Sequence, residues 1–339
     1  MRWKKGVGLK RMDGQNNIKF NDVPVYGTVM TDKAAQRKII RKQKRKKIFK
    51  YWQLYVLLAP ALIYFLVFKY YPMYGVQIAF KNFRPVDGIF GSEWAGFDHF
   101  IRFFESYYFW DLIWNTLSIN LYQLLLFPVS IIVALSLNEL RDGKFKKTAQ
   151  TITYAPHFIS VVVFVGMVIA FLDPLTGIVN HFIEFLGFEP INFMTSPEWF
   201  KTIYVFSGEW QNLGWGAIIY LAALAGIDPQ LHEAAKVDGA SRWQRIWHIN
   251  IPGIMPTIII LLILNMGNFM AVGFEKILLM QNELNLESSQ VIQTYVYDIG
   301  LLNGQFSYST AVGLFNSVVN FIILIIFNRL ARRTGTSLW

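Results

Sequence analysis

The chain has 339 residues, 54% of them apolar, and its 32 Lys and Arg against 22 Asp and Glu give a formal net charge of +10. That apolar fraction favours a membrane protein over a soluble one. The chain contains no cysteine, which excludes disulfides and cysteine metal ligands. The Lys and Arg cluster beside apolar segments, so we interpret the positive charge as a topology signal and expect no nucleic-acid partner.

Six segments are apolar over roughly the 20 residues that a helix needs to cross the hydrocarbon core of a bilayer. They cover about 52–70, 113–137, 151–172, 202–225, 254–272 and 311–330. A single segment could instead be a buried helix of a soluble core. That alternative is strongest for 202–225, which contains Glu209, Gln211 and Asn212. The charges that flank the segments argue against it for the set as a whole.

Charge alternates from one connection to the next. A basic run precedes the first segment and the connections after the second and fourth are basic, whereas those after the first, third and fifth are mixed or acidic. We expect the first and fifth connections, about 71–112 and 273–310, to be large outside loops. Lys and Arg near the ends of spanning helices stay in the cytoplasm. The predicted fold class is therefore an all-α membrane protein with six transmembrane helices and both termini inside. It comprises a basic cytoplasmic segment, 1–50, which can contact anionic membrane lipid, and a transmembrane domain, 51–339.

The fourth connection, residues 228–252, has strong local signals. Asp228 is a good N-cap, and Pro229 follows at the first helical position, where its missing N–H costs nothing. Gly239 can take the left-handed conformation that ends this helix, Ser241 can cap a second one, and Pro252 is expected to stop it. The segment is thus predicted to form an elbow of two helices.

The first of these helices has an apolar face. We expect that face to pack on the membrane helices and to leave Glu233 directed toward the cytoplasm. The apolar residues are Leu231, Ala234, Ala235 and Val237. From the residues alone, an ordinary amphipathic connector explains this pattern equally well.

Several fixed positions in this loop resemble the EAA loop of type I ABC importer permeases. They are Glu233-Ala234-Ala235, Asp238-Gly239-Ala240, Ile249, Pro252 and Pro256. The resemblance implies that the loop is a coupling helix that docks in a cleft of an ATPase subunit, with Glu233 pairing with a basic residue there and Gly239 making the bend. Ile246 departs from the family, which often has phenylalanine at that position.

Three further stretches resemble the carbohydrate branch of that family, in particular polysaccharide and aldouronate-type permeases. They are Tyr154 to Ser160, Trp210 to Gly226, and Ser337-Leu338-Trp339. The resemblance implies a multi-pass protein of the bacterial cytoplasmic membrane. Its expected partners are ABC ATPase subunits, a second permease that is usually a distinct chain, and an extracytoplasmic solute-binding protein. ATP and Mg would bind the partner ATPase, and this chain would bind no cofactor and no metal.

Polar residues inside spans tend to face the interior of a helix bundle or a cavity. Amides suit sugar hydroxyls and aromatic rings suit sugar C–H faces. We therefore predict a substrate cavity lined by Gln211, Asn212, Asn268, Trp210 and Trp215. The alternative is that intramembrane amides only bond neighbouring helices, which also applies to Asn115, Asn120, Asn316 and Asn320.

Motifs of nucleotide binding and hydrolysis are missing from the sequence. Gly143-Lys144 is followed by Phe145 and has no upstream glycine at the P-loop spacing, and neither H-E-x-x-H nor G-x-S-x-G occurs. We predict a transport subunit that is not an enzyme. The alternatives are a permease for a non-sugar solute, a secondary transporter, which should show inverted repeats that we do not find, and a membrane-embedded enzyme.

Overall fold

The computed structural model describes residues 50–332, which fall into two units that meet between Tyr71 and Pro72. The predicted basic segment up to residue 49, the Ser337-Leu338-Trp339 stretch and both termini lie outside the described residues. The first unit contains α2 (Trp52–Phe65) and the π-helical turn η1 (Leu66–Tyr70), and α3 (Tyr71–Met73) continues it into the second.

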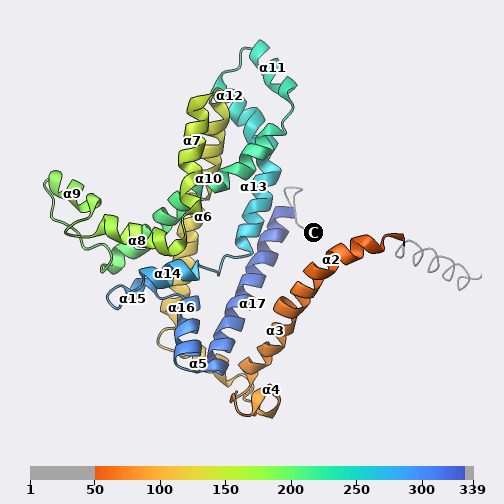
Figure 1. Cartoon of the computed structure of the whole chain (residues 1–339), viewed down its shortest axis with the longest axis vertical. Helices are drawn as coiled ribbons and strands as arrows, with labels where there is room; N and C mark the ends of the chain where they lie inside the picture. Colours follow the sequence, from red (N-terminus) through yellow and green to blue (C-terminus); the bar gives the residue numbers. More distant parts are fainter. Residues whose placement is uncertain (1–49, 333–339) are drawn as a thin grey trace, which may run out of the picture. The chain divides into compact units, whose positions relative to one another are not determined.

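The second unit holds the other helices (Figure 1). In chain order they are η2 (Tyr74–Phe80), α4 (Gly88–Gly91), α5 (Asp98–Phe104), α6 (Phe109–Glu139), α7 (Lys144–Tyr154), η3 (Ala155–Phe158), α8 (Val161–Leu172), α9 (Ile178–Phe185), α10 (Pro197–Ala225), α11 (Pro229–Val237), α12 (Arg242–Arg245), η4 (Ile246–Asn250), α13 (Ile251–Met266), α14 (Phe274–Met280), α15 (Leu286–Ser289), α16 (Ile292–Tyr297), η5 (Asp298–Leu302) and α17 (Phe306–Ala331). Residues 50–332 form no strand beyond one antiparallel bridge between Lys81 and Trp94. The all-α prediction is confirmed for this range.

Helix α10 is the central element, since it packs on α6, α7, η3, α13 and α15. A cluster of buried side chains joins it to α6 and α13, namely Ala134, Leu135, Ala217, Tyr220, Leu224 and Ile254. Gly214 lets α10 approach α7 closely, because a Cβ there would run into the backbone carbonyl of Thr153. Small residues at such crossings let backbones come together where lipid gives helices no hydrophobic reason to associate.

The number of spans is confirmed only in part. Four helical runs are long and apolar enough to cross a membrane: Trp52–Phe80, Phe109–Glu139, Arg242–Met266 and Phe306–Ala331. The bent pair Lys144–Phe158 and Val161–Leu172 is a fifth only if its two helices are counted as one span. The predicted segment 202–225 is helical within α10, but its polar residues make it less apolar than these spans. Six spans therefore remain a prediction.

The predicted helical segment 151–172 is not one continuous helix. The two helices of that pair are bent by 104° at the residues between them. Pro156 lies in the short 3-10 turn η3, and Ser160 adopts an extended conformation with ψ of 148°, which ends one helix and caps the next. A proline lacks the N–H of a helical hydrogen bond, so the break begins where the backbone ladder is already weakened.

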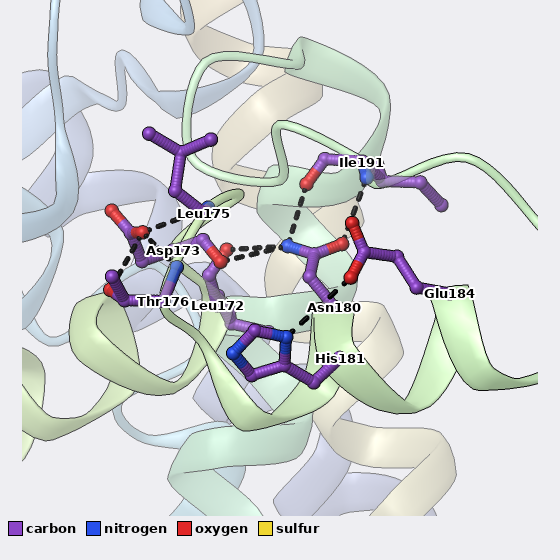
Figure 2. Close-up of polar contacts among 8 residues, drawn as sticks. All are labelled: Leu172, Asp173, Leu175, Thr176, Asn180, His181, Glu184 and Ile191. Atoms are coloured by element: carbon purple, nitrogen blue, oxygen red, sulfur yellow. Dashed lines mark hydrogen bonds and ion pairs between the residues drawn. The ribbon is translucent and has the colours of Figure 1, made fainter.

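The connection from 173 to 201 is folded around one amide. Asn180 of α9 is completely buried, and its Nδ2 donates to the carbonyl oxygens of Leu172, Asp173 and Ile191, while its Oδ1 accepts from the N–H of Ile191 (Figure 2). Asp173 also caps the following turn by accepting from the N–H groups of Leu175 and Thr176. This connection therefore has an ordered structure, in which Asn180 and Asp173 bond backbone groups that no helix pairs.

The predicted large loop at 273–310 is instead mostly helical. Helices α14, α15 and α16 and the π-helical turn η5 occupy it, and they pack on α8, α10, α6 and α17. Ile277, Met280 and Val291 from this segment belong to the same buried cluster as Phe164 of α8 and Tyr204 of α10. Residues assigned from sequence to an outside loop thus reach the interior of the second unit.

Candidate functional site

The elbow at 228–240 forms as predicted. Asp228 caps α11 by accepting a hydrogen bond of 2.9 Å from the N–H of Gln230, and Pro229 occupies the first turn. After α11 ends, Gly239 has a φ of +80°, the left-handed region that side chains with a Cβ disfavour. The N–H of Ala240 then bonds the carbonyl of Ala235, which closes the helix end.

The second helix of the elbow starts as predicted but does not stop at Pro252. Ser241 and Gln244 form a reciprocal capping box, with distances of 2.7 Å from the Ser241 N–H to Gln244 Oε1 and 3.3 Å from the Gln244 N–H to Ser241 Oγ. The chain then continues helically through the π-helical turn η4 into α13, so Pro252 lies in the first turn of α13. Pro252 lacks the N–H that a helix bonds to the carbonyl four residues back, and the π-helical turn directly before it, where that ladder is already interrupted, accommodates the loss.

Helix α11 is not packed on the other helices, contrary to the sequence prediction. None of its residues is buried, and Leu231 and Val237 are 53% and 88% exposed. Glu233 is exposed as well. In Figure 1, α11 lies at one end of the second unit, beyond α12, and α4 and α5 lie at the other. Residues 50–332 therefore leave the apolar side chains Leu231 and Val237 of α11 mostly exposed.

A second feature is a cavity of about 980 Å³ against one side of α10. Gln211, Asn212, Asn268 and Trp215, four of the five residues predicted to line a substrate cavity, line this space. Trp210 does not. It lies on another face of α10, with its ring 5.6 Å from that of Phe164.

The break between η3 and α8 is held against α10 at this cavity. Gln211 Nε2 donates a hydrogen bond of 3.1 Å to the carbonyl of Ile159, which lies in the break. His157 Nδ1 lies 3.0 Å from Asn212 Oδ1, and the imidazole stacks on the indole of Trp215 with 4.4 Å between ring centroids. The bend therefore presents His157 to the cavity, and α10 presents the indole of Trp215 beside it.

Four other amides bond backbone, as the packing alternative proposed. Asn115 donates to the carbonyls of Glu287 and Gln290, and Asn120 donates to Thr116 in its own helix. Asn316 and Asn320 donate to the segment just before α14, at Met270 and Gly267. These four residues position helices and lie outside the cavity lining.

Sequence reasoning missed one charged residue of the cavity wall. Lys276 of α14 is only 8% exposed and lines the cavity together with Tyr204 and Glu209 of α10. The sequence placed it in an outside loop. The only local signal was that Lys276 stands one residue before Ile277 and four before Met280, both buried on a short apolar helix.

The cavity is suited to binding a polar solute. Its volume falls within the usual range of about 300–1,000 Å³ for ligand pockets, and its amides, hydroxyls and stacked rings can contact a polar solute. Among residues 50–332, no three His, Asp or Glu side chains are grouped as metal ligands would be.

Comparisons with known proteins identify the family of the chain. Residues 127–336 match the family described as "Binding-protein-dependent transport system inner membrane component". The chain is 46% identical over 307 residues to the polygalacturonan/rhamnogalacturonan transport system permease protein YteP of Bacillus subtilis (strain 168), covering 89% of this chain and 96% of the relative. It is 46% identical to Protein LplB of the same strain, covering 83% and 88%.

A solved structure agrees with these relatives. It is a bacterial ABC transporter involved in the import of the acidic polysaccharide alginate, with a TM-score of 0.79, 43% identity, and coverage of 86% of this chain and 99% of that one. A second structure shows that alginate transporter with an alginate pentasaccharide-bound periplasmic protein, again with a TM-score of 0.79. The chain therefore belongs to the family of inner membrane components of binding-protein-dependent transport systems, as a multi-pass carbohydrate-branch permease of the ABC importers in the cytoplasmic membrane.

Proposed function

We propose that this chain forms part of the passage through which an ATP-driven importer moves an oligosaccharide, and that a separate ATPase drives it through α11. ATP and Mg bind the ATPase, and this chain supplies the cavity and the coupling loop. A second permease completes the passage, and an extracytoplasmic solute-binding protein delivers the sugar. The relatives support the sugar, since their names specify polygalacturonan and alginate.

One observation carries the coupling role. Helix α11 is capped at both ends yet buries none of its residues, and it leaves Leu231, Val237 and Glu233 exposed. An isolated helix of nine residues is marginal in water, because helix nucleation is costly. A partner cleft that covers the apolar face and meets the carboxylate of Glu233 would supply the missing packing. We assign the partner contact to Glu233, Ala234, Ala235, Asp238, Gly239, Ala240 and Pro252.

The helix between α11 and the cavity supports transmission. From Arg242 to Met266 the chain is continuously helical, and Asn268 of the cavity wall follows two residues later. A displacement of α11 would therefore be passed along one helix to the cavity. The alternating charges of the connections support six spans with α11 on the cytoplasmic side.

The test is whether Glu233 holds the ATPase. We expect Glu233→Ala to reduce co-purification with the ATPase and ATP-dependent uptake by about tenfold or more, the size of a lost charged hydrogen bond. Glu283→Ala is the matched control, because this carboxylate is also exposed but lies in the connection after α14. Its variant should behave as the wild type.

The chain has no cysteine, so a single Lys236→Cys change can place the loop. A membrane-impermeant thiol reagent should label it in inside-out vesicles and leave it unlabelled in intact cells. Labelling from outside, or uptake that persists when the ATPase is removed, would contradict the proposal and favour a secondary transporter.

A further inference from the structure

Lys276 is a buried ammonium whose hydrogen bonds are incomplete. Nζ donates to the carbonyl of Tyr204 at 2.7 Å and to Ser207 Oγ at 2.8 Å, both on α10. It also lies over the rings of Tyr204 and Phe164, 4.7 Å and 5.4 Å from their centroids. An ammonium has three N–H donors. The third has no hydrogen-bond partner among residues 50–332, and Lys276 lines the cavity.

No carboxylate neutralises this charge. Among residues 50–332, no Asp or Glu oxygen lies within 4.0 Å of Lys276 Nζ. Burial lowers the pKa of Lys276 to about 7, because removing the ammonium from water disfavours its charged form. Buried charges are normally paired, and the few that are not tend to mark functional sites.

The acid that shares the cavity faces another way. Glu209 lies beside the hydroxyl of Ser130 on α6, whereas Lys276 lies against Tyr204 and Ser207. Gly216 of α10 also meets Ser130, so Glu209 is on the face of α10 that contacts α6. The cavity therefore holds one positive and one negative group on separate walls.

Neutral polar and aromatic groups line the same cavity as this lysine. Asn212 and Asn268 supply amides and Trp215 a flat aromatic face to the same cavity. Such a set fits the hydroxyls and C–H faces of a sugar ring, and one free N–H of a buried ammonium fits one oxygen of a carboxylate. A phosphate, by contrast, is usually held by several donors at once, such as an arginine fork or successive backbone N–H groups.

We propose that Lys276 is a carboxylate-recognition residue of the translocation cavity, and that the oligosaccharide this permease passes contains uronic acids. The proposal rests on the proposed transport function and adds its substrate class. The uronate carboxylate would be the counter-ion that the protein itself does not provide. The neutral amides and Trp215 would contact the remainder of the ring.

The experiment compares a carboxylated sugar with its neutral ester. The complete transporter, with its ATPase, second permease and binding protein, is reconstituted in liposomes, and uptake of trigalacturonate and of its methyl ester is measured. For Lys276→Met we expect trigalacturonate uptake to fall about tenfold or more relative to wild type, and ester uptake to change less than about twofold. Lys276→Arg should retain trigalacturonate uptake, because it keeps the charge.

Two matched variants separate recognition from folding. Lys81 is also buried, donates to the carbonyl of Ile89 at 2.6 Å and lies over Trp94, but it stands outside the cavity lining, so Lys81→Met should leave the ratio of the two uptakes unchanged. Glu209→Gln removes the negative charge of the cavity and should raise trigalacturonate uptake relative to ester uptake. Methionine has nearly the volume of lysine, so Lys276→Met is expected to fold.

The outcomes distinguish the two proposals. Equal losses for both sugars in Lys276→Met, or no loss for either, would overturn carboxylate recognition and leave the transport function standing. Wild-type uptake of the ester but not of trigalacturonate would do the same. A wild-type complex that takes up neither sugar in an ATP-dependent way would overturn both proposals. Binding of trigalacturonate to the same complex in nanodiscs, without binding protein, gives a second readout that should weaken in Lys276→Met and recover in Lys276→Arg.

Discussion

The coupling loop and the cavity wall are held together by contacts of very different range. In the loop, Asp228 bonds a residue two positions away and Ser241 a residue three positions away. At the cavity, Gln211 reaches Ile159 across 52 positions and Lys276 reaches Tyr204 across 72. The loop is therefore a locally specified element that can move as a unit. The cavity wall depends on how several helices pack.

The largest effect is expected from a change in the packing between α10 and α7. Gly214→Ala would push a Cβ into the backbone of Thr153, which cannot rotate away as a side chain can, so α10 and α7 must separate. We expect a destabilisation at or above the usual overpacking range of about 1–3 kcal/mol, seen as a lower melting temperature and more aggregate on size exclusion.

Gly166→Ala in α8 is the control for that change. A Cβ at Gly166 meets no atom within 4 Å, and alanine favours helix by about 1 kcal/mol over glycine. Its melting temperature should equal or exceed that of the wild type. Equal behaviour of the two variants would show that the close approach of α10 to α7 does not support the fold.

A smaller effect is expected from a change in the coupling loop, at Gly239. Gly239→Val places a β-branched residue at a φ of +80°, which costs about 1–2 kcal/mol in the turn itself. Since α11 buries no residue, we expect the melting temperature to stay unchanged while ATP-dependent uptake falls. Gly239→Asn should be milder, because asparagine tolerates this conformation. A fall in melting temperature would mean that the elbow contributes to the stability of the other helices.

The smallest expected effect is a change with pH in how the cavity discriminates between charged and neutral sugars. The pKa of Lys276 is lowered to about 7, so the ammonium and its contact with a carboxylate are lost as the pH rises through that value. Carboxyl groups have ordinary pKa values near about 4 and stay ionised. We therefore expect the ratio of trigalacturonate uptake to ester uptake to fall from about pH 6 to about pH 8.

The other titratable groups that line the cavity are His157, Glu209, Tyr204 and Tyr220. Lys276→Arg separates them from the lysine, because arginine stays protonated over this range. The ratio should then be independent of pH. A slope that persists in Lys276→Arg would assign the pH dependence to another group and count against Lys276.

Several local features could be predicted from the sequence because they need only neighbouring residues. Asp228, Pro229, Gly239 and Ser241 behave as their capping and turn preferences indicate. The expectation that Pro252 ends the second helix was wrong, because the helix continues through the π-helical turn η4 into α13. The apolar residues of α11 were recognised, but their predicted packing on the membrane helices was wrong, since Leu231 and Val237 remain mostly exposed among residues 50–332.

The cavity shows where pattern reasoning stops. Polarity inside apolar segments was enough to select Gln211, Asn212, Asn268 and Trp215. It could not separate them from the amides that bond backbone, because both kinds are equally unfavourable in lipid. The prediction for Trp210 was wrong because successive residues of a helix point about 100° apart, so Trp210 lies on a different face of α10 from Gln211.

The sequence by itself determined the helical, membrane-embedded class, the elbow with its caps, and the family, because these depend on composition and on spacing within a few turns. Only the tertiary structure decided that the chain bends by 104° before α8, that the segment after α13 folds back, and that Lys276 meets Tyr204 at the cavity. Contacts between residues more than 50 positions apart depend on how helices pack, which no local preference encodes.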